Sequence, residues 1–328
     1  MLDVNKFRLK VGFLSTLYHT SFILKGTDLL DKEGIIAEWK LFPSGPDIVN
    51  AMIAGTIDLG YIGLPPVIIG ADRGADLKCI AGGHIEGTVM IAGPGYKKFQ
   101  ESENIREFLG QFRGQAIGCP PKGSIHDVII TDMIRCSGVR DIKIVNYPWA
   151  DYLPEALLSG EIAAALGTPA LAVTARRYGN AGIIMPPSQI WPYNPSYGIV
   201  VPGAVLGSGR QLSGFLRAHE NACELIRRNP GFCAMTVSRV MGIVDPGFVK
   251  ETFAVSPKYC AALPDEYIAS TMKFVEAMCN SGYITKDMDE TRIFDKTLIS
   301  RVHKGPPHYN EPVSNEPVSF IDEHPGVR

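Results

Sequence analysis

The chain begins with a regular alternation of apolar and polar positions. Phe7, Leu9, Val11 and Phe13 occupy every second position, and polar residues or glycine separate them. A period of two places successive side chains on opposite faces of an extended strand. We therefore expect a strand over residues 7–13.

The period then changes to that of a helix and back several times. Ile48, Val49, Met52 and Ile53 form one apolar helical face, and Gly55 follows it. Strands and helices that alternate at this spacing predict βα units and mostly parallel sheets. Further strands are expected at residues 36–42, 58–62, 78–82, 88–92, 115–119, 142–146, 161–166, 182–185 and 197–201.

The pattern of strands and helices restarts near residue 105, which indicates two lobes. A chain of 328 residues is long enough for two separate cores. After the strand at 197–201 the pattern becomes mainly helical. Residues 305–328 contain five prolines and no apolar period, so we expect an extended or disordered tail there.

The loops that follow strands supply the candidate ligand-binding residues. Ligands of open α/β sheets bind beyond the carboxyl ends of the strands, where helix N-termini present unpaired N–H groups. Ser124 is the principal candidate because it starts a predicted helix, where its hydroxyl and the neighbouring amides can bind an anionic group or simply cap the helix. The other candidates are Ser15, Thr16, Tyr18, His19, Gly63, Leu64, His84, Glu86, Lys122, Gly123, Trp149, Thr168 and Trp191.

Each of these candidates also has a structural interpretation. Gly63 can bring the backbone close to a ligand, or it can form the turn before two prolines. His84 and Glu86 form a His-x-Glu pair that suits acid–base chemistry or a structural role. Trp149 and Trp191 can line a cleft or pack between lobes. The remaining alternatives are core packing for Tyr18 and His19, solvation for Lys122 and a helix cap for Thr168.

Charge and cysteine content exclude several classes of function. The chain has 32 Lys and Arg against 34 Asp and Glu, without a clustered basic patch, so we expect no nucleic-acid partner. No stretch of about 18 apolar residues is free of helix breakers, so we expect no membrane span. The seven cysteines form no CxxC pair, so the sequence indicates neither a metal site nor a cofactor.

The sequence leaves the compartment open. An odd number of cysteines fits free thiols in a reducing environment. Residues 1–10 show no apolar core of a signal peptide. The expectation is either a cytoplasmic protein or an extracytoplasmic one whose signal peptide has been removed.

Residues 41–63 are similar to a known protein family. This segment reads LFPSGPDIVNAMIAGTIDLGYIG and fits the pattern F-x-x-G-x-x-x-x-x-A-x-x-x-G-x-I-D-x-G-x-x-G. Shorter likenesses extend the similarity over residues 7–201. The sequence resembles the solute-binding proteins of nitrate, sulfonate, taurine and bicarbonate ABC transporters, which are related to binding proteins for thiamine-pyrimidine precursors.

The resemblance implies a type II periplasmic-binding fold, with two mixed, mostly parallel sheets and a ligand cleft between two lobes. The first lobe would comprise residues 1–94 and 197–304, and the second residues 95–196. The protein would be a monomer that closes on a small, anionic solute and presents it to an ABC permease. Thr168-Pro169 stands where the family commonly has Asp-Pro, a change that removes a negative charge from the cleft and should alter ligand preference.

The same fold also serves cytoplasmic enzymes, including pyrimidine-forming proteins of the thiamine pathway and dehydratases of menaquinone biosynthesis. A lyase or dehydratase, or a cytoplasmic sensor, is therefore the alternative, with His19, His84 and Glu86 as acid–base candidates. The cysteine-rich motif of the pyrimidine-forming proteins is absent. Motifs for nucleophilic hydrolases, zinc proteases, P-loops and dinucleotide folds are absent too, so we favour a non-catalytic solute-binding protein.

Overall fold

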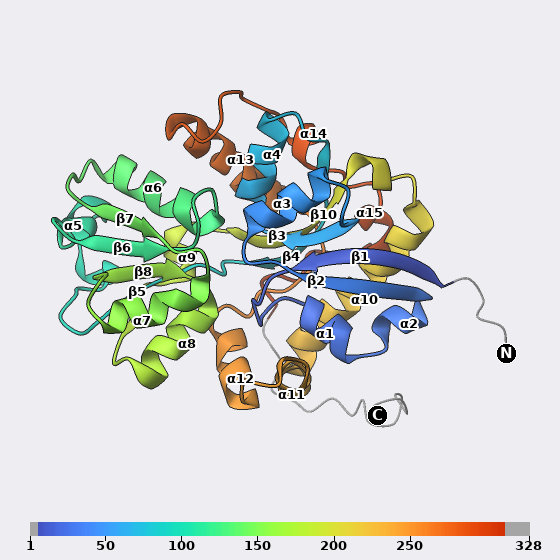
Figure 1. Ribbon diagram of the computed structural model, residues 1–328, viewed down its shortest axis with the longest axis horizontal. Coiled ribbons are helices and arrows are strands. Elements are labelled where there is room, and N and C mark those ends of the chain that lie inside the picture. The colour runs from blue at the N-terminus through green and yellow to red at the C-terminus, as the bar shows by residue number, and fades with distance from the viewer. Residues whose placement is uncertain (1–5, 312–328) are drawn as a thin grey trace.

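Two five-stranded sheets organise residues 6–311, the part of the chain that the computed structural model describes. Figure 1 shows the sheets side by side, each covered by helices on both faces. We call the part built on the first sheet the first half and the part built on the second sheet the second half. Within the described residues, no helix is both long and apolar enough to cross a bilayer.

The first sheet has the strand order β2-β1-β3-β10-β4. Strand β1 pairs in parallel with β2 and β3, whereas β10 runs antiparallel to β3 and β4. The alternation that predicts β1 is the reason why Leu9 and Val11 are fully buried beneath the covering helices. Its strands are β1 (Phe7–Phe13), β2 (Ile35–Leu41), β3 (Leu59–Ile62), β4 (Leu77–Ile85) and β10 (Pro195–Pro202).

The second sheet has the strand order β7-β6-β8-β5-β9. Strand β5 pairs antiparallel with β8 and β9, so it belongs to the second sheet. The expected first lobe, residues 1–94, therefore reaches too far, and the first crossing between the halves lies at residues 86–88. The strands of this sheet are β5 (Val89–Ala92), β6 (Ala116–Cys119), β7 (Lys143–Asn146), β8 (Ala164–Gly167) and β9 (Gly182–Met185).

The reason for this difference is the composition of β5. All four of its residues are apolar and buried, so its sequence carries no polar face that would assign it to one sheet. Only pairing with β8 decides where it lies. The second crossing runs through residues 186–194, close to the predicted boundary at residue 196.

Most helices of each half follow a strand. In the first half the helices before β10 are α1 (Ser21–Gly26), α2 (Leu29–Lys32), α3 (Gly45–Ile53) and α4 (Leu64–Asp72), and in the second half α5 (Ile105–Gly110), α6 (Ile125–Ser137), α7 (Leu153–Leu158), α8 (Pro169–Tyr178) and α9 (Pro187–Ile190). Short 3₁₀ turns lie at Phe99–Glu101, Ala150–Tyr152 and Gly203–Val205.

The region after β10 is mainly helical, as the sequence predicts. It contains α10 (Gly209–Arg228), α11 (Pro230–Met241), α12 (Pro246–Val255), α13 (Asp265–Asn280), α14 (Glu290–Ile293) and α15 (Ile299–Val302). The described part of the expected tail, residues 305–311, contains no helix or strand but is packed against the first half. Tyr309 is buried there, and its hydroxyl donates to the carbonyl of Ala262 at 2.9 Å. The rest of the expected tail, residues 312–328, lies outside the described residues.

Tyr197 of β10 packs its ring against the neighbouring strand β4. Its ring is fully buried and lies over Gly83, where a β-carbon would come within 2.1 Å of the ring. Real β-carbons do not approach other atoms so closely, so only glycine leaves room for this ring.

We predict that Gly83→Ala destabilises the protein by about 1–3 kcal/mol, because the added methyl group forces the buried ring of Tyr197 out of place. Urea denaturation of both forms measures the difference. The matched control is Gly93→Ala, since a β-carbon at Gly93 meets no atom within 4 Å. Equal losses for the two variants would contradict this account of the packing.

Candidate ligand-binding cleft

A cleft lies where the carboxyl ends of strands from both sheets meet. The first half contributes residues of the loop 14–19 after β1, the loop 43–45 after β2, and Gly63 and Pro66 at the start of α4. The second half contributes Pro120, Pro121, residues 124–126, Trp149, Ala150 and Thr168, and Ser196 of β10 completes the lining. The cleft thus has the position that the fold reserves for ligands.

Four helices begin at this cleft, two from each half. Ser44 precedes α3, Gly63 precedes α4, Ser124 precedes α6 and Thr168 precedes α8, and all four of these cap residues line the cleft. The first N–H groups of a helix have no partner within it and carry a partial positive charge. Prolines in the first turns of α3, α4 and α8 have no N–H, so these helices offer fewer donors than α6 does. The remaining N–H groups and the helix dipoles still give the cleft donors and a positive potential from both halves.

The four caps differ in how they use their side chains. The hydroxyl oxygens of Ser44 and Ser124 accept hydrogen bonds from the backbone N–H groups of Asp47 and Asp127, at 3.4 and 3.3 Å. The side chain of Thr168 makes no such bond to α8. Its hydroxyl is therefore available to a bound molecule.

Among the described residues, the lining of the cleft contains no Lys, Arg, Asp or Glu. The lining contains two histidines, His19 and His126. Burial lowers the pKa of His126 to about 4 and holds the pKa of His19 well below its ordinary value. Both rings are neutral near pH 7. Nδ1 of His19 and Nε2 of His126 are buried without a hydrogen-bond partner in the described residues.

One acid lies at the rim of the cleft. Asp151 follows the lining residue Ala150, and its side chain is hydrogen-bonded to Ser15 of the other half. Burial raises the pKa of the Asp151 carboxyl, while this hydrogen bond opposes the rise. The contact joins the two sides of the cleft directly.

The structure brings together most of the residues predicted for the site. Ser15, Thr16, Tyr18, His19, Gly63, Ser124, Trp149 and Thr168 all line this one cleft. Three other predicted residues, Leu64, Lys122 and Gly123, do not line the cleft. Leu64 is fully buried in the core, Lys122 is exposed, and Gly123 adopts a left-handed conformation (φ +80°) in which its N–H donates to the carboxylate of Asp127 at 2.8 Å.

His84 and Glu86 lie at the crossing between the halves and outside the cleft lining. Nε2 of His84 donates to the carbonyl of Ser256 at 2.5 Å, which leaves Nδ1 to accept from the hydroxyl of Ser196 at 3.0 Å. Burial lowers the pKa of His84 to about 3, so the ring stays neutral. Both nitrogens are thus occupied by the protein, which does not suit the acid–base role predicted for this residue.

Glu86 likewise connects the two segments that cross between the halves. It has a left-handed backbone (φ 57°), its carboxylate lies 2.7 Å from Nζ of Lys258, and it accepts the N–H of Tyr193 at 3.0 Å. Its own N–H donates to the carbonyl of Asn194 at 2.6 Å. We therefore assign Glu86 a structural position between the two crossing segments.

Trp191 also lies away from the cleft. Its indole stacks on Phe274 of α13 with ring centroids 4.1 Å apart, and its N–H donates to the hydroxyl of Ser270 at 3.1 Å. The packing interpretation of Trp191 therefore fits the structure, whereas Trp149 is in the lining.

Sequence reasoning missed several lining residues, chiefly Ser44, Gly45, His126 and Ser196. Ser44 caps α3 and Gly45 is its first residue. Both could have been found, because this helix start also follows a strand. His126 lies in the first turn of α6, two residues after Ser124. The sequence placed it in a loop that follows a strand, but no pattern distinguished its side chain from that of its neighbours. Ser196 lies within a strand, so only the pairing of β10 brings it to the cleft.

Comparison with known proteins identifies the family. The sequence matches the NMT1-like family over residues 3–241, more than half of its length. The chain belongs to the NMT1-like family. A protein of Brucella abortus (strain 2308) described as a binding protein is 26% identical over 141 residues. That match covers 42% of this chain and 40% of the relative, which is less than half the relative's length.

Solved structures share the fold of this NMT1-like protein. The alkanesulfonate-binding protein SsuA from Xanthomonas axonopodis pv. citri bound to MOPS has a TM-score of 0.72 and 17% identity, covering 89% of this chain and 99% of its own. The periplasmic nitrate-binding protein NrtA from Synechocystis PCC 6803 has a TM-score of 0.74 and 13% identity, covering 94% and 91%. The fold predicted from the sequence is confirmed.

We predict that the buried histidines make this NMT1-like protein less stable in mild acid. The folded state holds His126 neutral down to a pH of about 4, whereas the unfolded chain takes up the proton below the ordinary value of 6.5. Stability is therefore lost as the pH falls from 6.5 towards 4, by at most about 1.4 kcal/mol per pH unit for each such ring. His126→Gln should reduce this slope, as measured by urea denaturation across that range. Identical slopes for both proteins would contradict the prediction.

Proposed function

We propose that this protein is the solute-binding component of an ABC importer and that its cleft holds a small anion. One observation carries this proposal: four helices from two halves begin at one cleft whose described lining has no charged side chain. Such a site attracts an anion by oriented backbone dipoles and N–H donors. A cation would find no carboxylate in the lining to compensate its charge.

The side chains of the cleft suit an anion with several acceptor oxygens. Ser15, Thr16 and Thr168 supply hydroxyl groups from both halves. His19 and His126 are neutral rings with an unpartnered nitrogen each, and a neutral ring can place its N–H on that nitrogen. A ligand oxygen would give these buried atoms the partner that they lack among the described residues.

Part of the lining is apolar. Leu14, Ile125 and Trp149 lie beside the polar caps. An organic anion with a short apolar part, such as a sulfonate or a carboxylate, fits both kinds of surface better than a bare inorganic ion. The alkanesulfonate-binding protein bound to MOPS and the nitrate-binding protein named above share this fold, and they define the ligand classes to test first.

Closure of the cleft would proceed about the two crossings. Residues 86–88 and 193–196 are tied to each other, since the N–H of Gly87 donates to the hydroxyl of Ser196 and the amide of Asn194 donates to the hydroxyl of Thr88. Such linked segments can act as one hinge. The closed form, with both halves on the ligand, is then the form presented to a membrane permease.

The direct test is a ligand screen with the full chain. Alkanesulfonates, taurine, nitrate, bicarbonate and short carboxylates are added singly, and the melting temperature and the native mass spectrum are recorded. We expect one ligand per chain and a raised melting temperature for at least one anion class. A protein that is stabilised by none of these anions, or only by cationic solutes, would contradict the proposal.

We predict that Thr168→Asp weakens binding of the anion by about 100-fold or more, because it places a carboxylate beside a ligand of the same charge. Isothermal titration calorimetry with the anion found in the screen measures the loss. The matched control is Asn180→Asp, which adds the same charge at an exposed position just beyond the other end of α8. Unchanged or tighter binding of the anion by Thr168→Asp would contradict its placement beside Thr168.

A further inference from the structure

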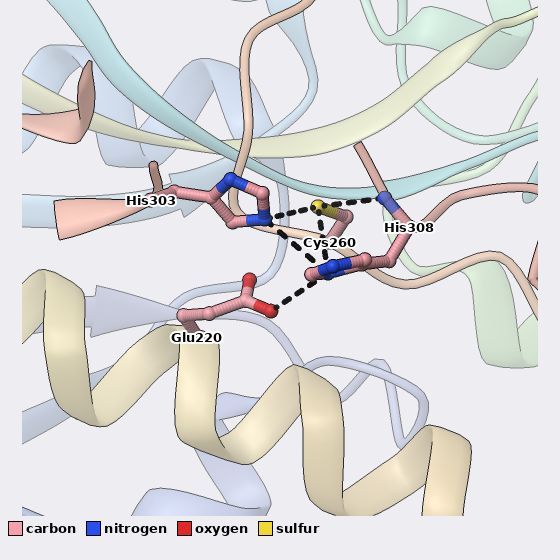
Figure 2. Close-up of side chains that lie close together, drawn as sticks. All are labelled: Glu220, Cys260, His303 and His308. Carbon is pink, nitrogen blue, oxygen red and sulfur yellow. Dashed lines mark hydrogen bonds and ion pairs between the residues drawn. The ribbon is translucent and has the colours of Figure 1, made fainter. Parts of the chain in front are cut away.

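Four potential metal ligands from three separate segments meet in the first half, away from the cleft. Glu220 lies on α10, and Cys260 lies in the segment between α12 and α13. His303 and His308 both lie in the segment after α15 (Figure 2). One donor atom from each residue can be chosen so that all four atoms lie within 4.8 Å of one another. Such a convergence of a thiol, two imidazoles and a carboxylate is the donor set of a zinc site.

Three of the six distances between the donor atoms are close to those of a tetrahedral zinc site, and the others are at most 4.8 Å. Nε2 of His303 lies 3.2 Å from Nδ1 of His308 and 3.3 Å from Sγ of Cys260. Nδ1 of His308 lies 3.4 Å from Oε1 of Glu220 and 3.9 Å from Sγ of Cys260. Metal–ligand distances of zinc in a tetrahedral site require neighbouring ligand atoms roughly 3.3–3.6 Å apart.

We propose that Glu220, Cys260, His303 and His308 bind one divalent cation of the zinc type in a closed, four-coordinate structural site. With all four positions taken by protein atoms, the site has no place for a substrate, which distinguishes it from a catalytic metal centre. The inference does not depend on what the cleft binds.

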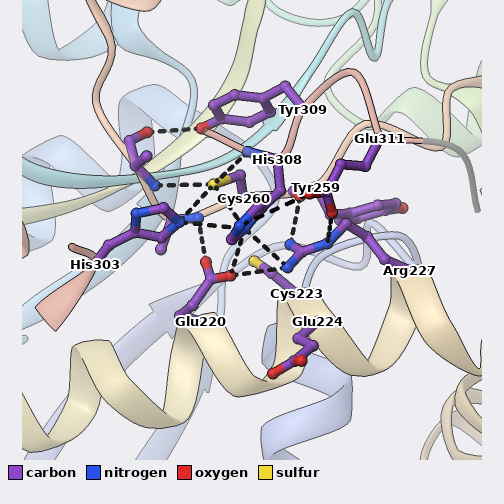
Figure 3. Close-up of polar contacts among 12 residues, drawn as sticks. Glu220, Cys223, Glu224, Arg227, Tyr259, Cys260, His303, His308, Tyr309 and Glu311 are labelled. Carbon is purple, nitrogen blue, oxygen red and sulfur yellow. Dashed lines mark hydrogen bonds and ion pairs between the residues drawn. The ribbon is translucent and has the colours of Figure 1, made fainter. Parts of the chain in front are cut away.

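Hydrogen bonds from neighbouring residues orient the sulfur of Cys260 and the carboxylate of Glu220 (Figure 3). Backbone N–H groups of Ala262 and His308 both donate to Sγ of Cys260 at 3.4 Å, hydrogen bonds that would stabilise the sulfur as a metal-bound thiolate. Oε2 of Glu220 accepts the N–H of Ala261 at 2.7 Å, which leaves Oε1 directed at the imidazole of His308. Nε2 of His308 lies 3.9 Å from Oε1 of Glu311, so a carboxylate lies on the far side of this ring.

Arg227 is the one positive side chain that competes for these ligands among the described residues. Its Nη2 lies 3.0 Å from Oε1 of Glu220 and 3.1 Å from Nδ1 of His308. A bound cation would displace only the contact with His308. Arg227 would keep its hydrogen bond to the carbonyl of Tyr259 at 2.7 Å, its contact with Glu220 and its ion pair with Glu311 at 3.7 Å.

The charges then balance. A thiolate at Cys260 and the carboxylate of Glu220 together neutralise a divalent cation, and Glu311 faces Arg227. The cation would fasten the segment 303–308 to α10 and to the segment around Cys260. That segment is bonded to β4, since the N–H of Cys260 donates to the carbonyl of Gly83.

The test uses the full chain freed of metal with a chelator and then given zinc alone. Native mass spectrometry should show one zinc per chain, and hydrogen exchange of residues 303–309 should slow on binding. Cobalt in place of zinc should give the intense visible bands of a four-coordinate ion together with a thiolate-to-metal charge-transfer band. No bound metal, or a cobalt spectrum without a thiolate band, would overturn the proposal.

Variants locate the site. Cys260→Ser and His303→Gln should each weaken zinc binding by roughly 100-fold or more, whereas Cys136→Ser, which changes an exposed thiol in the second half, should bind like the unaltered chain. Full binding by both Cys260→Ser and His303→Gln would overturn the assignment. Should Cys260→Ser fail to fold, His303→Gln and the cobalt spectrum of the unaltered chain decide the question. Thr168→Asp should keep its zinc, so failure of the metal site and failure of the anion site remain distinguishable.

Discussion

The starts of α3, α4, α6 and α8, with the dipoles and the N–H groups that prolines and caps leave free, are the constraint on which the cleft depends. A helix cannot satisfy its first N–H groups internally, and a buried N–H without a partner costs free energy. In this protein the four starts lie where two sheets end, so their donors converge on one space. The strand–loop–helix connections of a parallel sheet place helix starts at one edge of each sheet, and the cleft lies where those edges of the two sheets meet.

The two halves are held in register by side chains close to, but outside, the cleft. His84, Glu86, Asn194 and Ser196 form a network of hydrogen bonds across both crossings. Buried polar networks of this kind favour one arrangement, because breaking these hydrogen bonds leaves further buried polar atoms without partners. Residues that resemble an acid–base pair in the sequence thus serve the geometry of the site.

The cleft and the four-ligand cluster lie in different parts of the molecule and contain different chemical groups. In the proposed function, backbone dipoles and neutral side chains of the cleft hold a ligand that enters and leaves. In the proposed metal site, the thiol, imidazole and carboxylate groups would hold an ion that stays and fastens the segment 303–308 to the first half. Tyr309, buried beside Gly82 of β4, shows that this segment is already part of the core of the first half.

The sequence by itself determined the α/β class, the order of the elements and the position of the cleft. Period-two and period-3.6 patterns identify strands and helices locally, and residues that directly follow strands, such as Ser15 and Ser124, must lie at the sheet edge. Tertiary structure alone decided which sheet the wholly apolar β5 joins, because its local pattern is the same in either. It also decided that His84 faces the crossing, and that Glu220, Cys260 and His303 meet, since residues so far apart in the chain are brought together only by packing.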